Sequence, residues 1–350
     1  EQINDQFLDW AILDDDGNLF KAGDNFGGGP GGSGTPADLI YYGASATDYT
    51  DRYELKTNEV ANDWSDLIDL MDFINNSSDA DFQAQFHERF EKMELFRAFA
   101  IDNLFGNLDS YTGSARNYYL YHNMTTGLWE WIKWDGNESF GSYANGQTTN
   151  ILDVEYANSD RPLLERILAD PAFNTDYKNH LCDLIDTYFN NAYMDPKIDA
   201  LYTLIQNDVY ADNNKMYSNT DFDNNITSNI SSGGGPGGGT IYGIKSFIST
   251  RVSNVTGQID CNYYNDLNEL ENQHFVLYPN PANNQVTIEL STKSERVEVF
   301  NVSGQLVFAS DVPNNEKTLE FFVDDYENGV YVVMLHSSGT IHTERLMVHH

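Results

Sequence analysis

The sequence predicts an α+β protein in which a mainly helical lobe with a small β-hairpin region is followed by an immunoglobulin-like β-sandwich. Three observations predict this arrangement. Apolar residues recur at helical spacing over much of the stretch from Asp63 to Ile259. Inside that stretch, two strand-like segments, Tyr118–Tyr121 and Leu128–Trp134, flank a Thr-Thr-Gly turn. Residues 275–350 instead alternate apolar and polar positions, which is typical of short strands with one buried face.

The helices of the first part are predicted from apolar stripes, after a mixed, strand-like stretch over residues 1–60. The first stripe comprises Trp64, Leu67, Ile68 and Met71. One long helix is expected next, from about Asp79 to Phe105, because Phe82, Phe86, Phe90, Met93, Phe96 and Ala100 share a face. Further helices are expected at Pro162–Ala169, Phe173–Phe189, Pro196–Tyr210 and about Ile244–Ile259.

The second part reads as about seven strands separated by turns. In Val286–Leu290 every second residue is apolar, and the pattern recurs in Val297–Val302, Leu306–Phe308 and Val330–Leu335. So many strands in so short a stretch predict a small β-sandwich. We therefore expect three parts: a domain over 1–257, a linker over 258–274 and the sandwich over 275–350.

Composition limits the function. The chain has 350 residues and a net charge of −35, which repels phosphate backbones and anionic lipid. Nucleic-acid and membrane-surface binding are therefore disfavoured, whereas oxygen-ligand sites for Mg²⁺ or Ca²⁺ are easy to assemble. No apolar run is long enough to form a transmembrane segment. Cys182 and Cys261 could pair in an oxidising compartment if their Cα atoms lie within about 7 Å.

The segment from Asn107 to Gly141 carries side chains that suit phosphoryl transfer. Asp109 is followed by Asn117, by the expected hairpin, and then by Asp135 ahead of a Phe-Gly step. Phosphoryl transfer needs one carboxylate near the attacking hydroxyl, and an Asn and a second carboxylate that hold Mg²⁺ on the phosphates. A helix C-terminus followed by a turn and a hairpin explains the same pattern without any chemistry.

A second acidic stretch, Asp14-Asp15-Asp16-Gly17-Asn18, imitates the start of a Ca²⁺ loop. Its twelfth position is Asn25 instead of a bidentate Glu, and no flanking helix is predicted. An Asp-Gly hairpin turn is the better interpretation.

The tail resembles the C-terminal sorting domain of the type IX secretion system, which belongs to Bacteroidota-type bacteria. The resemblance is carried by YPNP at Tyr278–Pro281, an N-x-x-G-x-x-V step at Asn301–Val307, GVY at Gly329–Tyr331 and a terminal strand with Arg345 as its basic residue. It implies export through the periplasm, release or anchoring at the cell surface, and the type IX secretion machinery as a partner. An ordinary immunoglobulin-like module is the alternative.

The first part resembles the CotH kinase family, first known from spore coat proteins. The motifs are N-x-D-S-x-x-G-S-x-x-N-Y-Y-L-Y-H from Asn107 and W-x-W-I-x-W-D-x-N-x-x-F-G from Trp129. Supporting stretches lie at Glu1–Asp5, Gly17–Ala22, Ala37–Gly43, Asp51–Asn58 and Ile244–Val255. The resemblance covers about residues 1–257 and implies a kinase-like lobe that transfers phosphate from ATP to a protein hydroxyl, with Mg²⁺ as cofactor and an unknown protein substrate.

Carried over residue by residue, the resemblance implies Asp109 as the catalytic-loop carboxylate and Asp135 as the metal-binding carboxylate. Asn117 is implied as a second metal ligand. Two positions depart from the family pattern: Lys133 stands where many relatives have Pro, and Asn137 stands where some have a second acid. The second departure would weaken metal binding.

In the family, the strands that cover ATP and carry the phosphate-contacting Lys precede the step at which this sequence begins. We therefore expect a front-truncated domain that binds Mg-nucleotide weakly or not at all. Lys56 is an alternative phosphate contact, although a strand-end Lys explains it as well. The rival hypotheses are a non-catalytic surface protein that keeps the kinase-like fold, and a carbohydrate-binding adhesin, because the chain has 22 Tyr and 5 Trp.

Overall fold

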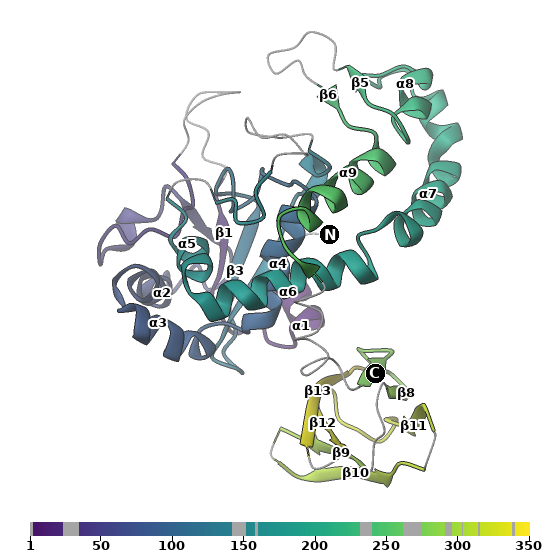
Figure 1. Cartoon of the computed structure of the whole chain (residues 1–350). Coiled ribbons are helices and arrows are strands. Elements are labelled where there is room, and N and C mark those ends of the chain that lie inside the picture. The colour runs from purple at the N-terminus through teal and green to yellow at the C-terminus, as the bar shows by residue number, and fades with distance from the viewer. Residues whose placement is uncertain are drawn as a thin grey trace. The chain divides into compact units, whose positions relative to one another are not determined.

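The computed structural model describes residues 3–23, 35–141, 152–157, 160–231, 240–261, 275–290, 296–302, 304–313, 316–337 and 340–350. The chain divides into two compact units, Glu1–Asp266 and Leu267–His350. Figure 1 shows a mixed helix–sheet unit and an all-β unit, which confirms the α+β class. Two glycine-rich stretches of the sequence, 27–34 and 233–239, and residues 262–274 of the expected linker lie outside the described residues.

The sheet of unit 1 has four antiparallel strands in the order β2-β1-β3-β4. They are β1 (Leu19–Ala22), β2 (Tyr53–Leu55), β3 (Tyr118–His122) and β4 (Trp129–Lys133). The predicted hairpin is thus confirmed, with Tyr118 opposite Lys133 in its register. A short second pair, β5 (Ile230–Ser231) and β6 (Thr240–Ile241), lies further along the chain.

The rest of unit 1 is largely helical. Its helices are α1 (Asp5–Ala11), α2 (Ser65–Asn76), α3 (Asp79–Gln85), α4 (Lys92–Leu104), α5 (Pro162–Ala169), α6 (Pro171–Thr187), α7 (Asn191–Ala211), α8 (Asn219–Asn224) and α9 (Ile244–Thr256). Short 3₁₀ turns lie at Ala46–Asp48, Phe86–Glu88 and Gly136–Glu138. Helix α4 packs against both α6 and β4, so it connects the helical layer to the sheet. Among the described residues, no helix combines the length and the apolar character that crossing a membrane requires.

The expected single helix over Asp79–Phe105 is wrong in its middle. It is broken into α3, a 3₁₀ turn and α4, because Arg89 and Phe90 pair with β4 instead of continuing the helix. The carbonyl of Arg89 accepts a hydrogen bond from Trp129 N at 2.7 Å, and Phe90 forms a β-bridge with Trp129. The aromatic stripe is still buried: Phe86 lies 4.9 Å from Phe173 of α6, ring centre to ring centre.

A disulfide between Cys182 and Cys261 closes the helical part of unit 1. Their Cα atoms are 5.3 Å apart, within the limit set from the sequence, so the pairing hypothesis is confirmed. Cys182 is buried in α6 and Cys261 follows α9, so the bond ties the end of α9 to the centre of the helical layer.

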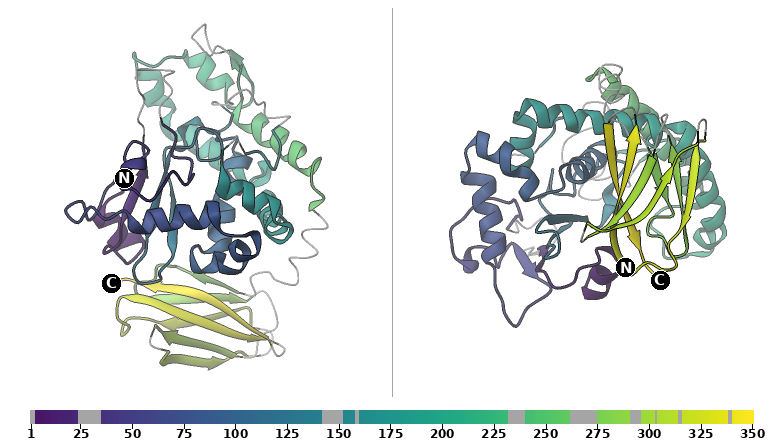
Figure 2. Two further views of the ribbon diagram at one scale, coloured as in Figure 1. Left: turned by 90° about the vertical axis from the view of Figure 1, so that its left-hand side faces the viewer. Right: turned by 90° about the horizontal axis from the view of Figure 1, so that it is seen from below.

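Unit 2 is a two-layer β-sandwich (Figure 2). One antiparallel sheet has the order β10-β9-β12-β13 and the other β11-β8-β7. The strands are β7 (Phe275–Tyr278), β8 (Gln285–Leu290), β9 (Arg296–Asn301), β10 (Leu306–Asp311), β11 (Thr318–Phe322), β12 (Gly329–Ser337) and β13 (Thr340–Val348). Their inward residues share one core, for example Val286 and Ile288 of β8 with Val299 of β9 and Val333 of β12. The alternation in Val286–Leu290 therefore predicted the buried face of β8, whereas Val302 and Leu306, apolar positions of two other runs, are exposed.

Candidate active site

The candidate catalytic loop begins where α4 ends. Gly106 adopts φ 58°, a left-handed conformation that costs glycine little. The N–H of Gly106 bonds to Asn103 O at 3.1 Å and the N–H of Asn107 bonds to Asp102 O at 2.9 Å. These two bonds form a Schellman motif, which stops the helix and turns the chain sharply into residues 107–117.

The backbone of residues 107–117 is held by one hydrogen bond within the loop and by two from the side chain of Arg161. Ser114 N donates to Leu108 O at 3.0 Å, and Gly113 leaves room for this approach, since a Cβ there would lie 2.0 Å from the same oxygen. The buried guanidinium of Arg161 donates to the carbonyls of Tyr111 and Gly113, both at 2.5 Å. The backbone of the loop is therefore held by hydrogen bonds on two sides.

Asp109 presents a carboxylate that its own loop orients. Ser114 Oγ donates to Oδ1 at 2.7 Å, and Asn117 Nδ2 donates to Oδ2 at 2.9 Å. Arg116 Nε lies 3.6 Å from Oδ1, and the Asp109 side chain is 20% exposed. A carboxylate accepts about four hydrogen bonds, so each oxygen keeps acceptor capacity for a further group.

Asn117 connects the loop to the segment that carries Asp135. It has φ 60°, and its amide nitrogen also donates to Asp109 O at 2.7 Å. The backbone carbonyl of Asn117 accepts a hydrogen bond at 3.1 Å from the backbone N–H of Trp134, the residue before Asp135. Asp135 has φ 49°, is exposed, and precedes the 3₁₀ turn Gly136–Glu138. Asp109 and Asn117 therefore touch directly, whereas Asp135 is linked to them through the backbone of Trp134.

The donor set around this segment suits magnesium. Asp109, Asn117 and Asp135 offer only oxygen ligands, which Mg²⁺ prefers. Among the described residues, no three His, Cys, Asp or Glu side chains gather closely enough to hold a metal ion by themselves. Mg²⁺ that binds together with nucleotide needs only one or two carboxylates, because phosphates and water complete its shell. The roles of Asp135 and Asn117 as metal ligands stay predictions.

An ion pair between α4 and β4, with a buried carboxylate and a partly exposed lysine, was missed from the sequence. Asp102 of α4, whose side chain is 3% exposed, pairs with Lys133 at the end of β4. The same Asp102 oxygen, Oδ1, accepts a hydrogen bond from Asn107 Nδ2 at 3.0 Å. The only signal in the sequence was a charged residue in the apolar stretch before Asn107, together with the unexpected Lys133.

Arg251 holds the other side of α4. It is fully buried in α9 and donates to Asn103 O at 3.3 Å and to Leu152 O at 2.7 Å. Burial lowers the pKa of Arg251 to about 10, although Tyr177 and Asp153 partly oppose this shift. The end of α4 is thus fixed by polar contacts before the candidate loop begins.

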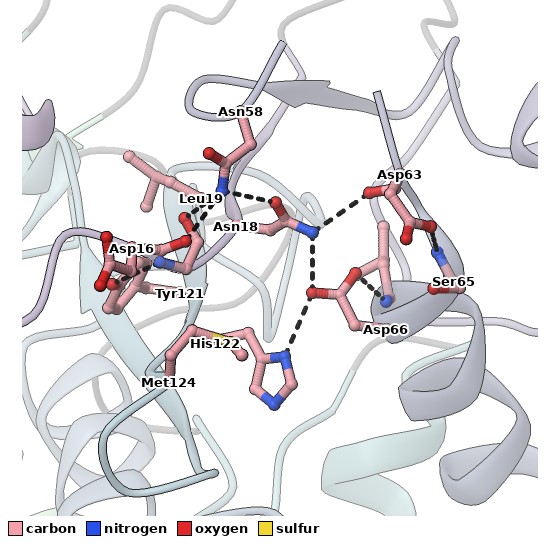
Figure 3. A network of polar contacts seen from close by, with 12 residues as sticks. Asp16, Asn18, Leu19, Asn58, Asp63, Ser65, Asp66, Tyr121, His122 and Met124 are labelled. Atoms are coloured by element: carbon pink, nitrogen blue, oxygen red, sulfur yellow. Dashed lines mark hydrogen bonds and ion pairs between the residues drawn. The ribbon is translucent and has the colours of Figure 1, made fainter. Parts of the chain in front are cut away.

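A second polar network lies at the other end of the hairpin (Figure 3). Asp66 Oδ2 accepts from Asn18 Nδ2 at 3.0 Å and lies 3.2 Å from His122 Nδ1. The His122 ring stacks on Trp129 with 4.7 Å between ring centres. Asn58 Nδ2 donates to Asn18 Oδ1 at 3.1 Å, which completes the link between α2, β1 and β3.

The acidic stretch near this network is structural. Asp14 accepts hydrogen bonds from the Thr125 hydroxyl at 2.7 Å, from Thr125 N at 2.9 Å, from Met124 N at 3.1 Å and from the Tyr121 hydroxyl. Burial would raise the pKa of Asp14, but these bonds together lower it. The stretch joins α1 to β1, so the expectation of a hairpin turn is wrong, and Asp14 instead fixes the β3–β4 turn.

Lys56, the alternative phosphate contact, lies just after β2. Its Nζ donates to Glu54 Oε1 at 2.8 Å, and its backbone N–H donates to Leu19 O at 2.8 Å. These contacts fit a lysine at the end of a strand.

Comparison with known proteins finds one family match in each unit of the chain. Residues 1–232 match the family model described as CotH kinase protein, and residues 276–349 match the secretion system C-terminal sorting domain. The chain is 30% identical over 154 residues to the inner spore coat protein H of Bacillus subtilis (strain 168). That match spans 44% of this chain and 41% of the relative, well under two thirds of its length.

A solved structure of PorZ, described as an essential bacterial surface component of the type-IX secretion system of Porphyromonas gingivalis, also matches. The identity is 22%, the TM-score is 0.19, and the match covers 24% of this chain and 12% of PorZ. A likeness this weak says nothing about the fold.

The sorting domain indicates secretion to the cell surface by the type IX machinery. Because the CotH kinase protein model matches residues 1–232, more than half of the 350 residues, the chain belongs to the CotH kinase protein family.

Proposed function

We propose that the helical unit transfers the γ-phosphoryl group of Mg-ATP to a hydroxyl group of a protein. The observation that supports this proposal is that Asn117 makes two contacts. Its side chain donates a hydrogen bond to the Asp109 carboxylate, and its backbone carbonyl accepts one from Trp134 N, next to Asp135. These contacts bring together the two segments that phosphoryl transfer needs, one for the hydroxyl and one for the metal.

Each residue has a distinct task in this reaction. Asp109 orients the substrate hydroxyl and accepts its proton as the oxygen attacks the γ-phosphorus and the bond to ADP breaks. Ser114 and Asn117 hold the carboxylate of Asp109 in one orientation for this task. Asp135, with Asn117, would hold Mg²⁺, which neutralises charge on the phosphates when bound.

A non-catalytic surface protein with the same fold is the second candidate. Both Asp109 oxygens already accept hydrogen bonds within the loop, which is also how a carboxylate stabilises a turn. ATP is scarce outside cells, where the sorting domain directs the chain. A structural role for Asp109 would need neither nucleotide nor metal.

Calorimetric titration of the whole chain with ATP, with and without Mg²⁺, separates the two candidates. We expect weak binding that requires Mg²⁺, that is lost in Asp135→Asn, and that persists in Asp109→Asn. Transfer from γ-labelled ATP to casein or to the chain itself should fall about 10²–10⁴-fold in Asp109→Asn, because its proton acceptor is gone. Asp208→Asn, an exposed carboxylate on α7, is the matched control. Binding that is unchanged in Asp135→Asn, or absent from the parent chain at millimolar ATP, contradicts the proposal.

A further inference from the structure

We propose that Asp102 and Lys133 are positioning residues that fix the distance between the Asp109 loop and the Asp135 segment. This inference rests on the proposed function, because it assigns the pair a task in the same site. Neither residue is expected to touch substrate. Their effect would pass through the backbone on either side of them.

The first step is the place of Asp102. Its backbone carbonyl accepts the Asn107 N–H that closes the Schellman motif, and its carboxylate accepts the Asn107 side chain at 3.0 Å. Asn107 is buried, and among the described residues its Oδ1 has no hydrogen-bond partner. Asp102 is thus the acceptor that orients Asn107, two residues before Asp109.

The second step is the place of Lys133. It is the last residue of β4 and lies two positions before Asp135. The intervening residue, Trp134, donates its N–H to Asn117 O at 3.1 Å, while its ring packs edge-on against Tyr119. The ion pair with Asp102 therefore attaches the start of the Asp135 segment to α4, as Trp134 attaches it to the loop.

The third step is the charge balance of the pair. The Asp102 side chain is 3% exposed and that of Lys133 is 33% exposed. A carboxylate this buried is costly to leave unpaired, so the pair holds one geometry more firmly than an exposed pair would. If Lys133 is removed, Asp102 must turn toward water or another donor, and Asn107 loses its fixed acceptor.

An ion pair on the same helix provides a matched control. Lys92, the first residue of α4, lies 2.6 Å from Asp176 of α6, with side chains 36% and 21% exposed. Lys92→Met removes one positive charge and one ion pair that involves α4, as Lys133→Met does, but at the end of the helix that does not lead into the loop. Effects that arise only from lost stability should appear in both variants.

The experiment compares the whole parent chain with Lys133→Met, Lys133→Arg, Asp102→Asn and Lys92→Met. We expect Lys133→Met and Asp102→Asn to weaken Mg²⁺-dependent ATP binding about tenfold, in the range found for groups that support metal ligands. Lys92→Met should bind as the parent does, and Lys133→Arg should restore most of the loss. Equal effects of Lys133→Met and Lys92→Met would overturn the positioning role.

Amide hydrogen exchange of the same variants provides a readout that needs no activity. The N–H groups of Ser114 and Trp134 close the loop and its link to Asp135, so they should exchange about tenfold faster in Lys133→Met than in Lys92→Met. Unchanged exchange there would overturn the inference even if the chain binds ATP. If the two N–H groups exchange faster in Lys133→Met but the parent chain binds no nucleotide, the positioning role is supported and the proposed function is rejected. If Lys133→Met fails to fold, Asp102→Asn, which keeps the shape of the side chain, decides in its place.

Discussion

Removal of the disulfide should lower the melting temperature of unit 1 by about 8 °C. Cys182 and Cys261 are 79 residues apart in the sequence, so the bond shortens a long loop of the unfolded chain. The loop-entropy relation gives about 4.5 kcal/mol of stabilisation for this separation. For a unit that spans Glu1–Asp266, an unfolding entropy of about 0.56 kcal/mol per kelvin converts this into the expected shift.

Differential scanning calorimetry of the Cys182→Ser/Cys261→Ser variant measures this shift directly. The parent chain treated with reductant should melt at the same temperature as the variant, which controls for the serine substitutions. Gln258, three residues before Cys261, also holds this end of α9, because its side chain accepts from Val154 N at 3.0 Å. A shift below about 2 °C would refute the reasoning, since it would mean that this end opens locally before the cooperative unit melts.

Three further predictions concern the linker, the loop and pH. Limited proteolysis should cut first between Cys261 and Phe275, within the expected linker of 258–274, where the sequence is polar, and first cuts within 286–335 would contradict the proposed boundary. Arg161→Met should lower the unfolding free energy in urea by about 3 kcal/mol, since the carbonyls of Tyr111 and Gly113 lose charged donors, and a loss under about 1 kcal/mol would contradict the bracing role. Burial lowers the pKa of His180 to about 4 in the folded protein, and the nearby charges of Arg97 and Lys92 lower it further. As the pH falls, His180 therefore binds a proton in the unfolded chain before it does so in the folded protein. The free energy of unfolding should therefore fall by up to about 3 kcal/mol between about pH 6.5 and pH 4. If a His180→Gln variant, unfolded in urea at each pH, loses as much stability over this range as the parent chain, His180 is not the cause of the loss.

Local patterns allowed much of the fold to be predicted. The hairpin of β3 and β4 and the alternation in Val286–Leu290 depend on neighbouring residues, so the sequence alone indicates them. The break between α3 and α4 could not be predicted, because Phe86 and Phe90 keep helical spacing. The helix breaks because the N–H of Trp129, far along the chain, donates a hydrogen bond to the carbonyl of Arg89.

The candidate site divides in the same way. Asp109, Asn117 and Asp135 stand out by their order along one short segment and by the resemblance to the CotH kinase family, and their roles stay predictions. The contact between Asp109 and Asn117 follows from a short loop. The pair formed by Asp102 and Lys133 joins a helix to a strand across the hairpin, and no period in the sequence indicates that the two charges meet.

The central claim is that Asp135 holds the metal of a bound nucleotide beside Asp109. A crystal structure of the chain with Mn²⁺ and a non-hydrolysable ATP analogue tests it most directly, because Mn²⁺ is visible by its anomalous scattering and binds the same oxygen ligands as Mg²⁺. We predict an anomalous peak about 2.1 Å from an Asp135 oxygen, with the γ-phosphate facing the Asp109 carboxylate. A nucleotide bound elsewhere, or a peak without Asp135 among its ligands, would contradict the account.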